Sequence, residues 1–157
     1  MENSNIDNDS AEKTDDVTDK TAAMGAKENR PTKAEVTDYF LVSHVIAANN
    51  GLSFSITLNV GGILISGLLI GGKEYFQEFG RVFQDAHPND PDRTYEKSIQ
   101  ALGDIYDGSD AKEPPLYIHL KDAKFYSGGI GSGTPKDGAL WRGRISSVDG
   151  FILGSFQ

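Results

Sequence analysis

The amino-acid sequence predicts an α+β domain: a small, barrel-like antiparallel sheet of five short strands, with an N-terminal helix and a two-helix insertion between strands 2 and 3. Three observations support this fold class. Residues 52–70 have the pattern of two strands joined by a glycine turn, residues 73–106 repeat apolar side chains at helical spacing, and the strand period returns after residue 115. We expect the helices to cover open ends or one face of the sheet.

A first helix is expected over residues 33–48. Thr32 and Glu35 have the spacing of a capping box, in which each side chain bonds a free backbone N–H at the helix start. The helix would end at the Asn-Asn-Gly run of residues 49–51, because asparagine and glycine readily close helices. Its apolar side chains recur at helical spacing: Val36, Tyr39, Phe40 and Ile46.

A β-hairpin is expected over residues 52–70. Residues 52–60 alternate strictly between apolar and polar side chains, as in a half-buried antiparallel strand. Gly61 and Gly62 can adopt the positive φ of a tight hairpin turn, and Gly67 in the following strand indicates close approach of another backbone. Since an isolated hairpin is not stable in water, its apolar face must be covered.

Two helices are expected after the hairpin. The first covers residues 73–86 and ends before Pro88, and the second begins after a cap at Asp90 and ends at residue 107. Packing of their aromatic stripes against the sheet is the favoured interpretation, and a groove for a partner is the alternative. The stripe of the first helix is Tyr75, Phe76, Phe79 and Phe83, and that of the second is Tyr95, Ile99, Leu102 and Tyr106.

The strand period of 2 returns after two consecutive prolines, and an Asp-Gly pair at residues 149–150 predicts a turn between the last two strands. The expected segments are a strand over 116–121 with a short extended piece over 124–126, a glycine-rich loop over 127–138, and strands over 140–145 and 151–156.

Residues 1–32 are expected to form a disordered acidic tail and residues 33–157 a single domain. Residues 1–35 contain nine acidic and five basic residues and no aromatic residue, so this segment cannot bury enough apolar area to offset its ordering entropy.

The start lacks the pattern of a signal peptide. The absence of cysteine excludes disulfides and thiolate metal sites and is typical of a reducing compartment.

The charge distribution limits the classes of partner that the protein can bind. A net charge of −8 makes nucleic acid an unfavourable ligand, because phosphate binding needs a basic surface. Residues 112–147 nevertheless carry six basic and three acidic residues, which indicates one locally basic face. Residues 39–72 contain no charged side chain, but their purely apolar part is shorter than the roughly 20 residues that a spanning helix needs. No membrane contact is expected.

No catalytic, cofactor or metal site is predicted. None of the histidines, His44, His87 and His119, has a second histidine or a carboxylate at a metal-ligand spacing. The loop over residues 128–135 has two glycines five apart, but Thr134 stands where a Walker loop requires the lysine that contacts phosphate. The residues therefore favour a protein that is not an enzyme.

Three separated blocks of the sequence resemble the gas vesicle accessory protein GvpU family. They are LSFSITLNVGGILISGLLIGGKEYF, YIHLKDAKFYSG and WRGRISSVDGFILGSF, within residues 38–79 and 117–156. The resemblance implies a cytoplasmic, gas-vesicle-associated protein that acts without catalysis in vesicle assembly or in organising vesicles. The implied partners are gas vesicle shell proteins, other accessory proteins and copies of this chain.

A second resemblance concerns the fold and supplies the alternative function. Leu58, Gly62 and Gly67 in a two-strand unit after a helix, with Arg142 and Gly143 in a late strand, resemble an Sm-type barrel. The alternative is therefore an Sm-like oligomeric RNA-binding protein. The turn that would carry the base-reading polar residues of that family is Gly-Gly-Lys-Glu here, and those polar residues are absent.

A partner-binding set is predicted on the late strands. If these strands pair antiparallel, their basic residues share one polar face, and tryptophan and arginine are enriched at interfaces. An ordinary solvated strand face is the alternative. This face or an unpaired sheet edge would bind partner chains by charge or by strand addition, and the acidic tail would make association salt-dependent. The set is Trp141, Arg142, Arg144, Lys121, Lys124 and His119.

Overall fold

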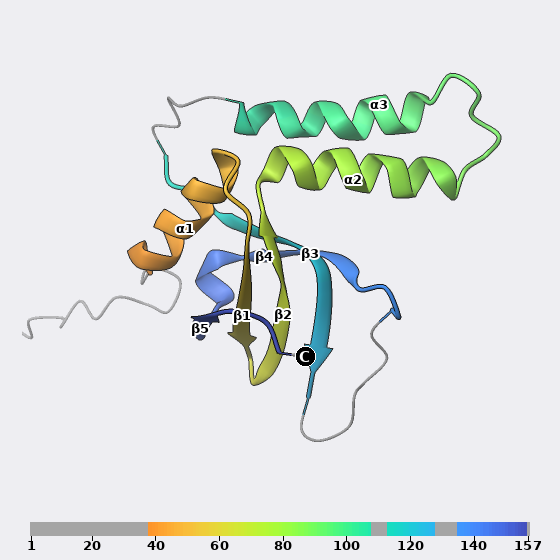
Figure 1. Cartoon of the computed structure of the whole chain (residues 1–157). Helices are drawn as coiled ribbons and strands as arrows, with labels where there is room; N and C mark the ends of the chain where they lie inside the picture. The colour runs from red at the N-terminus through yellow and green to blue at the C-terminus, as the bar shows by residue number, and fades with distance from the viewer. Residues whose placement is uncertain (1–37, 108–112, 128–134, 157) are drawn as a thin grey trace, which may run out of the picture. The chain divides into compact units, whose positions relative to one another are not determined.

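The computed structural model describes residues 38–107, 113–127 and 135–156 (Figure 1). Its centre is one five-stranded sheet in the order β4-β3-β2-β1-β5, in which all neighbours are antiparallel. The predicted α+β class and the strand number are confirmed. The sheet is open, however, because β4 and β5 form opposite edges, so "barrel-like" describes it only loosely. The strands are β1 (Phe54–Val60), β2 (Ile63–Ile70), β3 (Tyr117–Tyr126), β4 (Ala139–Arg144) and β5 (Gly150–Leu153).

Helix α1 (Tyr39–Asn49) precedes the sheet and is capped by Asp38. The Asp38 carboxylate accepts hydrogen bonds from the backbone N–H groups of Phe40 and Leu41, at 2.9 and 3.2 Å. The helix therefore begins at Tyr39, so the predicted start at residue 33 is wrong, and Thr32 and Glu35 of the predicted capping box lie outside the described residues. The physical reason is that an aspartate in extended conformation already satisfies the free N–H groups of the first turn.

One face of the sheet packs against α1 and forms the hydrophobic core. The predicted strand is confirmed, and its Ile56 and Leu58 are completely buried on this face. Thr57 on the opposite face is buried as well, so β1 is not half-buried at this point as predicted. Gly61 and Gly62 make the predicted turn, with φ of 60° and 85°. The buried members of the core are Leu41, Val42, Val45, Ala48, Ile56, Leu58, Ile65, Leu69, Ile118, Leu120, Ala123 and Ile145.

A helical insertion follows β2 and packs over part of the opposite face (Figure 1). It consists of α2 (Gly72–Asp85), α3 (Thr94–Ala101) and a 3₁₀ turn η1 (Leu102–Tyr106). The two-helix insertion is thus confirmed, with the second helix shorter than predicted. Asp90 contributes to its start, since its carboxylate accepts from the Tyr95 N–H at 3.0 Å. Glu96 is buried against α2, whereas Leu102 is exposed, so the predicted apolar stripe of α3 is only partly turned inward.

The chain after β5 crosses back over the sheet on the face opposite α1. The Gly154 N–H donates to the Ser55 carbonyl at 2.8 Å, and the Thr57 hydroxyl donates to the Gly154 carbonyl at 2.9 Å. The Phe156 N–H then donates to the Ser66 hydroxyl at 3.0 Å. We call residues 154–156 the C-terminal strap. It covers one end of this face, and α2 covers the other end.

Two further strand predictions are corrected. The pieces predicted separately over 116–121 and 124–126 form one strand, β3, because a bulge at Asp122, with φ of 54°, shifts the register against β2 without ending the pairing. The last strand ends at residue 153 rather than 156, because the strap leaves the ladder there. The predicted tail over residues 1–32 and most of the predicted loop over 127–138 lie outside the described residues.

Candidate interaction surface on the sheet

Four cationic side chains lie on the sheet face opposite α1. The register of β3 and β4 pairs Tyr117 with Arg144 and His119 with Arg142, so both arginines stand on the same face as these aromatic rings. On β3, Lys121 is opposite Leu68 and Lys124 is opposite Ser66, on the same side of the sheet. We call Lys121, Lys124, Arg142 and Arg144 the cationic row.

Arg142 is half-buried in an aromatic cage. Its guanidinium carbon lies 3.8 Å from the Tyr117 ring centroid and 5.4 Å from that of Phe76. Nη1 donates to the Tyr106 hydroxyl at 3.2 Å and to His119 at 2.8 Å. These contacts join β3, β4, α2 and η1 at one point. No carboxylate within the described residues forms a salt bridge with Arg142, so the aromatic rings and hydrogen bonds alone hold its charge.

His119 is buried beneath the insertion and is neutral. Its ring lies 4.7 Å from that of Tyr75 and 5.5 Å from that of Tyr106, centroid to centroid. Because a guanidinium can only donate, Nε2 accepts from Arg142 and the proton of the neutral ring is on Nδ1. Nδ1 is buried and makes no hydrogen bond within the described part of the chain. Burial, reinforced by the Arg142 charge, lowers the pKa of His119 to about 3.

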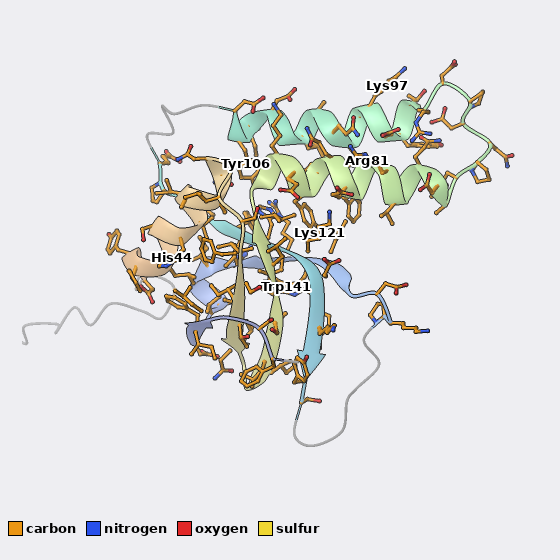
Figure 2. All side chains as sticks on the ribbon, viewed as in Figure 1. His44, Arg81, Lys97, Tyr106, Lys121 and Trp141 are labelled. Carbon is orange, nitrogen blue, oxygen red and sulfur yellow. The ribbon has the colours of Figure 1, made fainter. Side chains whose placement is uncertain are left out.

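The other three cations differ in how they are paired. Lys121 donates to the Glu78 carboxylate on α2 at 3.2 Å, and the same carboxylate accepts from Arg81. Figure 2 shows Lys121 beneath α2. Lys124 and Arg144 are exposed and form no salt bridge with any described residue.

Trp141 lies on the opposite face from the cationic row. It is paired with the core residue Leu120 and packs against the core on the α1 side. A Cβ placed on Gly143 would lie 2.2 Å from the Trp141 indole, so the ring covers this glycine and needs its missing side chain. The structure therefore corrects the expectation of one basic and aromatic strand face. The cationic row lies on one face of the sheet, whereas Trp141 lies on the other face. His119 is on the face of the cationic row but is buried beneath α2.

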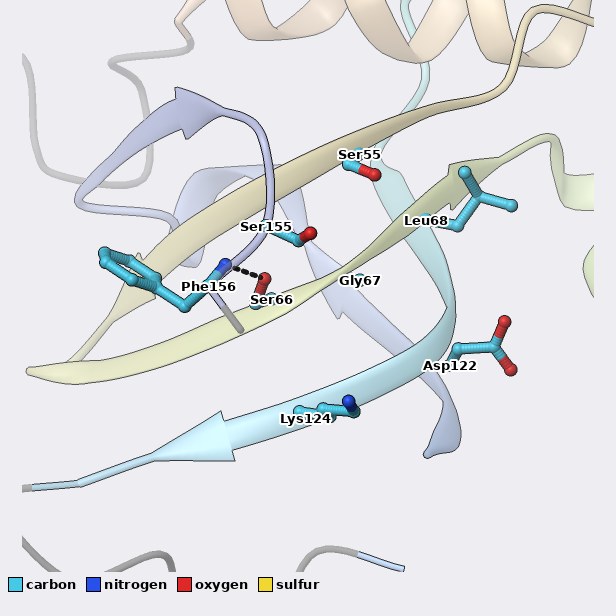
Figure 3. A pocket seen from close by; sticks show the side chains of 8 residues that line it. All are labelled: Ser55, Ser66, Gly67, Leu68, Asp122, Lys124, Ser155 and Phe156. Atoms are coloured by element: carbon cyan, nitrogen blue, oxygen red, sulfur yellow. Dashed lines mark hydrogen bonds between the residues drawn. The ribbon is translucent and has the colours of Figure 1, made fainter. Parts of the chain in front are cut away.

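Two of the hollows that adjoin the cationic row lie beside Lys124 and Lys121. The first, of about 580 Å³, lies between the C-terminal strap and the bulge of β3, and Figure 3 shows the strap crossing it. Its lining residues are Ser55, Ser66, Gly67, Leu68, Asp122, Lys124, Ser155 and Phe156. The second, of about 420 Å³, lies between α2 and the start of β4 and includes Phe79, Val82 and Leu140. Sequence patterns could not reveal either hollow, because each depends on how α2 and the strap cross the sheet.

Within residues 38–107, 113–127 and 135–156, no group of three or more histidine, aspartate or glutamate side chains is arranged to hold a metal ion. In the same part of the chain, no helix has the length and apolar character required to cross a membrane.

Comparison with known families identifies the family of the chain. A family described as gas vesicle protein GvpU-like matches residues 38–156, which include every described helix and strand. The chain belongs to this family. Membership of the GvpU-like family relates the protein to gas vesicles and confirms the family expected from the three sequence blocks. No curated protein and no solved structure matches the chain.

Proposed function

We propose that this GvpU-like protein is a non-catalytic accessory protein that acts in gas vesicle assembly or clustering by binding other proteins in the cytoplasm. The observation that carries the proposal is the family match across residues 38–156, since it covers the whole described domain. The partners would be gas vesicle shell proteins or other accessory proteins, with self-association as a further contact.

The surface of the domain supports a binding role. An open sheet has two free edges, and unpaired strand edges are ready templates for another chain. Large apolar side chains are exposed near both: Phe79 and Val82 of α2 above β4, and Ile152 and Leu153 within β5. Arginine and aromatic side chains around an apolar patch are typical of protein interfaces. The cationic row supplies the charge of such a surface.

The acidic N-terminal segment would make this binding dependent on salt. Residues 1–35 carry a net charge of −4, and residues 112–147 carry +3. In our proposal the acidic segment keeps copies of the chain apart, and the basic residues attract acidic partners. Both effects are screened at high ionic strength, because the Debye length falls from about 10 Å at 0.1 M salt to about 3 Å at 1 M.

A flotation experiment tests the proposal. Purified full-length chain is mixed with intact gas vesicles and centrifuged, and the protein that rises with the buoyant vesicles is measured. We expect wild type to rise at low salt and to be largely released at 1 M salt. The Arg144→Glu and Lys124→Glu double variant should rise several-fold less. Lys97→Glu is the matched control, because Lys97 is an exposed lysine on the far side of α3 (Figure 2).

The proposal fails if wild type stays in solution with vesicles and with lysate of vesicle-forming cells. The charge mechanism fails if binding is equal at low and high salt and after deletion of residues 1–32. A gel shift with short uridine-rich RNA, together with sedimentation that looks for a hexamer or heptamer, tests the Sm-like alternative. A tight RNA complex would favour that alternative over our proposal.

A further inference from the structure

We propose that the free edge of β4 binds an extended segment of a partner protein as a sixth strand, and that this segment carries apolar and acidic side chains at alternate positions. The inference rests on the proposed function and specifies the chemistry of the partner. It follows from three features that meet along β4: a ladder edge with no neighbour among the described strands, an exposed apolar part of α2, and two arginines that form no salt bridge with a described residue.

The outer ladder edge of β4 pairs with no other strand of the described part of the chain. β4 pairs with β3 on one side and is the first strand in the sheet order, so its outer side has no neighbour among the described strands. Its six residues extend for about 20 Å at roughly 3.3 Å per residue, which accommodates a peptide of similar length. An added strand gains main-chain hydrogen bonds from this edge, and the pockets beside it select alternate side chains.

The apolar stripe of α2 extends beyond the part of the sheet that it covers. Tyr75 and Phe76 pack over His119, whereas Phe79 and Val82, further along the helix, are 39% and 61% exposed. These two side chains and Leu140 line the hollow of about 420 Å³ at the start of β4. A strand added there would place an apolar side chain between α2 and Leu140. The hollow thus selects an apolar residue at one end of the segment.

The other end of β4 selects negative charge. Leu140, Arg142 and Arg144 are at alternate positions and therefore face the same side, toward the insertion. Arg144 is exposed and forms no salt bridge with a described residue, and of the Arg142 guanidinium nitrogens only Nη1 makes a hydrogen bond to a described residue. Carboxylates opposite the two arginines would form charge-assisted hydrogen bonds. A basic segment would be repelled.

The geometry therefore defines a pattern of side chains. A bound strand has an apolar residue opposite Leu140, then acidic residues two and four positions away, opposite Arg142 and Arg144. The order along the peptide is apolar-x-acidic-x-acidic for a parallel strand and the reverse for an antiparallel strand. Intervening residues face the α1 side, near the edge of the Trp141 ring. This pattern is short enough to be tested with synthetic peptides.

The test uses two dye-labelled hexapeptides with threonine at the intervening positions. One has leucine, glutamate and glutamate at positions 1, 3 and 5, and the other has the reverse order. Fluorescence anisotropy with the full-length chain measures their affinity. Each peptide is compared with a version in which lysine replaces both glutamates. Two further versions carry N-methyl groups on alternate backbone nitrogens. One version is methylated at the odd-numbered residues and the other at the even-numbered residues.

We expect one peptide orientation to bind, and its lysine version to bind at least tenfold more weakly. N-methylation of the set that faces β4 should abolish binding, while N-methylation of the other set changes affinity less than twofold. Arg144→Glu and Val82→Glu in the protein should each weaken binding about tenfold, and Lys97→Glu should not. Equal effects of the two N-methylated sets, tighter binding of the lysine peptide, or no binding of either orientation would overturn the inference.

Two outcomes separate this inference from the proposed function. If the Val82→Glu variant rises with gas vesicles to the same extent as wild type, the β4 edge is not the docking site. A role at vesicles would still stand. If the chain forms a dimer that Val82→Glu and Arg144→Glu dissociate and that the peptides do not displace, a second copy occupies the edge and the inference of an acidic partner segment is wrong.

Discussion

Replacement of His119 with leucine should change how stability depends on pH. His119 is enclosed by aromatic rings and has a pKa lowered to about 3, against 6.5 in the unfolded chain. Between these two values the unfolded state binds a proton that the folded state excludes. The stabilising effect of the neutral ring is therefore complete above pH 6.5 and is lost progressively as the pH falls toward 3.

The size of the effect follows from the two pKa values. At pH 5 the pH is about 1.5 units below the pKa of an unfolded histidine. Proton binding to the unfolded state therefore lowers the free energy of unfolding by about 2 kcal/mol relative to pH 7.5. His119→Leu removes this cost. We expect wild type to lose about 2 kcal/mol more than His119→Leu between pH 7.5 and pH 5, in urea titrations followed by tryptophan fluorescence. Taking the difference between the two proteins removes the contribution of the carboxylates, which titrate in both.

His87→Ala is the matched control, because His87 is exposed at the end of α2. This variant should keep the full acid loss of wild type. Direct titration of the imidazole resonances by NMR should show one histidine that stays neutral down to pH 4. A parallel loss of stability in wild type and His119→Leu, or titration of every histidine near pH 6.5, would refute a buried, neutral His119.

Three further substitutions test other contacts. Gly143→Ala should cost about 1–3 kcal/mol and shift the emission of Trp141, because a Cβ there overlaps the indole; Gly150→Ala, which meets no atom within 4 Å, should cost less than half as much in the same urea titration. Asp38→Ala should lower the unfolding free energy by about 1 kcal/mol through loss of the helix cap, and Asp38→Asn should largely preserve it; equal losses would contradict a capping role. Thr57→Val removes the buried hydroxyl that bonds the C-terminal strap, and should make the last residues several-fold more sensitive to carboxypeptidase, whereas Thr57→Ser should not.

Local patterns in the sequence predicted most of the elements. The alternation of residues 52–60 and the glycine turn at residues 61–62 fix a hairpin by short-range geometry alone, and the structure confirms both. The start of α1 was predicted wrongly because the sequence offers two possible caps, the Thr32–Glu35 pair and Asp38. Sequence spacing alone does not show at which of them the helix begins.

The candidate site was less predictable, because it depends on contacts between distant elements. Alternation along β4 placed Arg142 and Arg144 on one face, as expected, and by the same rule it places Trp141 on the other. Burial of His119 could not be inferred, since it requires the position of the inserted α2 over β3. Tyr106 as a partner of Arg142 had no sequence signal, because the two residues meet only when the insertion folds back onto the sheet.

The most direct test of our account is the state of gas vesicles in vesicle-forming cells that lack this chain. Electron microscopy should show a changed number or grouping of vesicles, restored by wild type and by Lys97→Glu but not by the Arg144→Glu and Lys124→Glu double variant expressed at the same level. Vesicles unchanged in number and arrangement after removal of the chain would contradict the account.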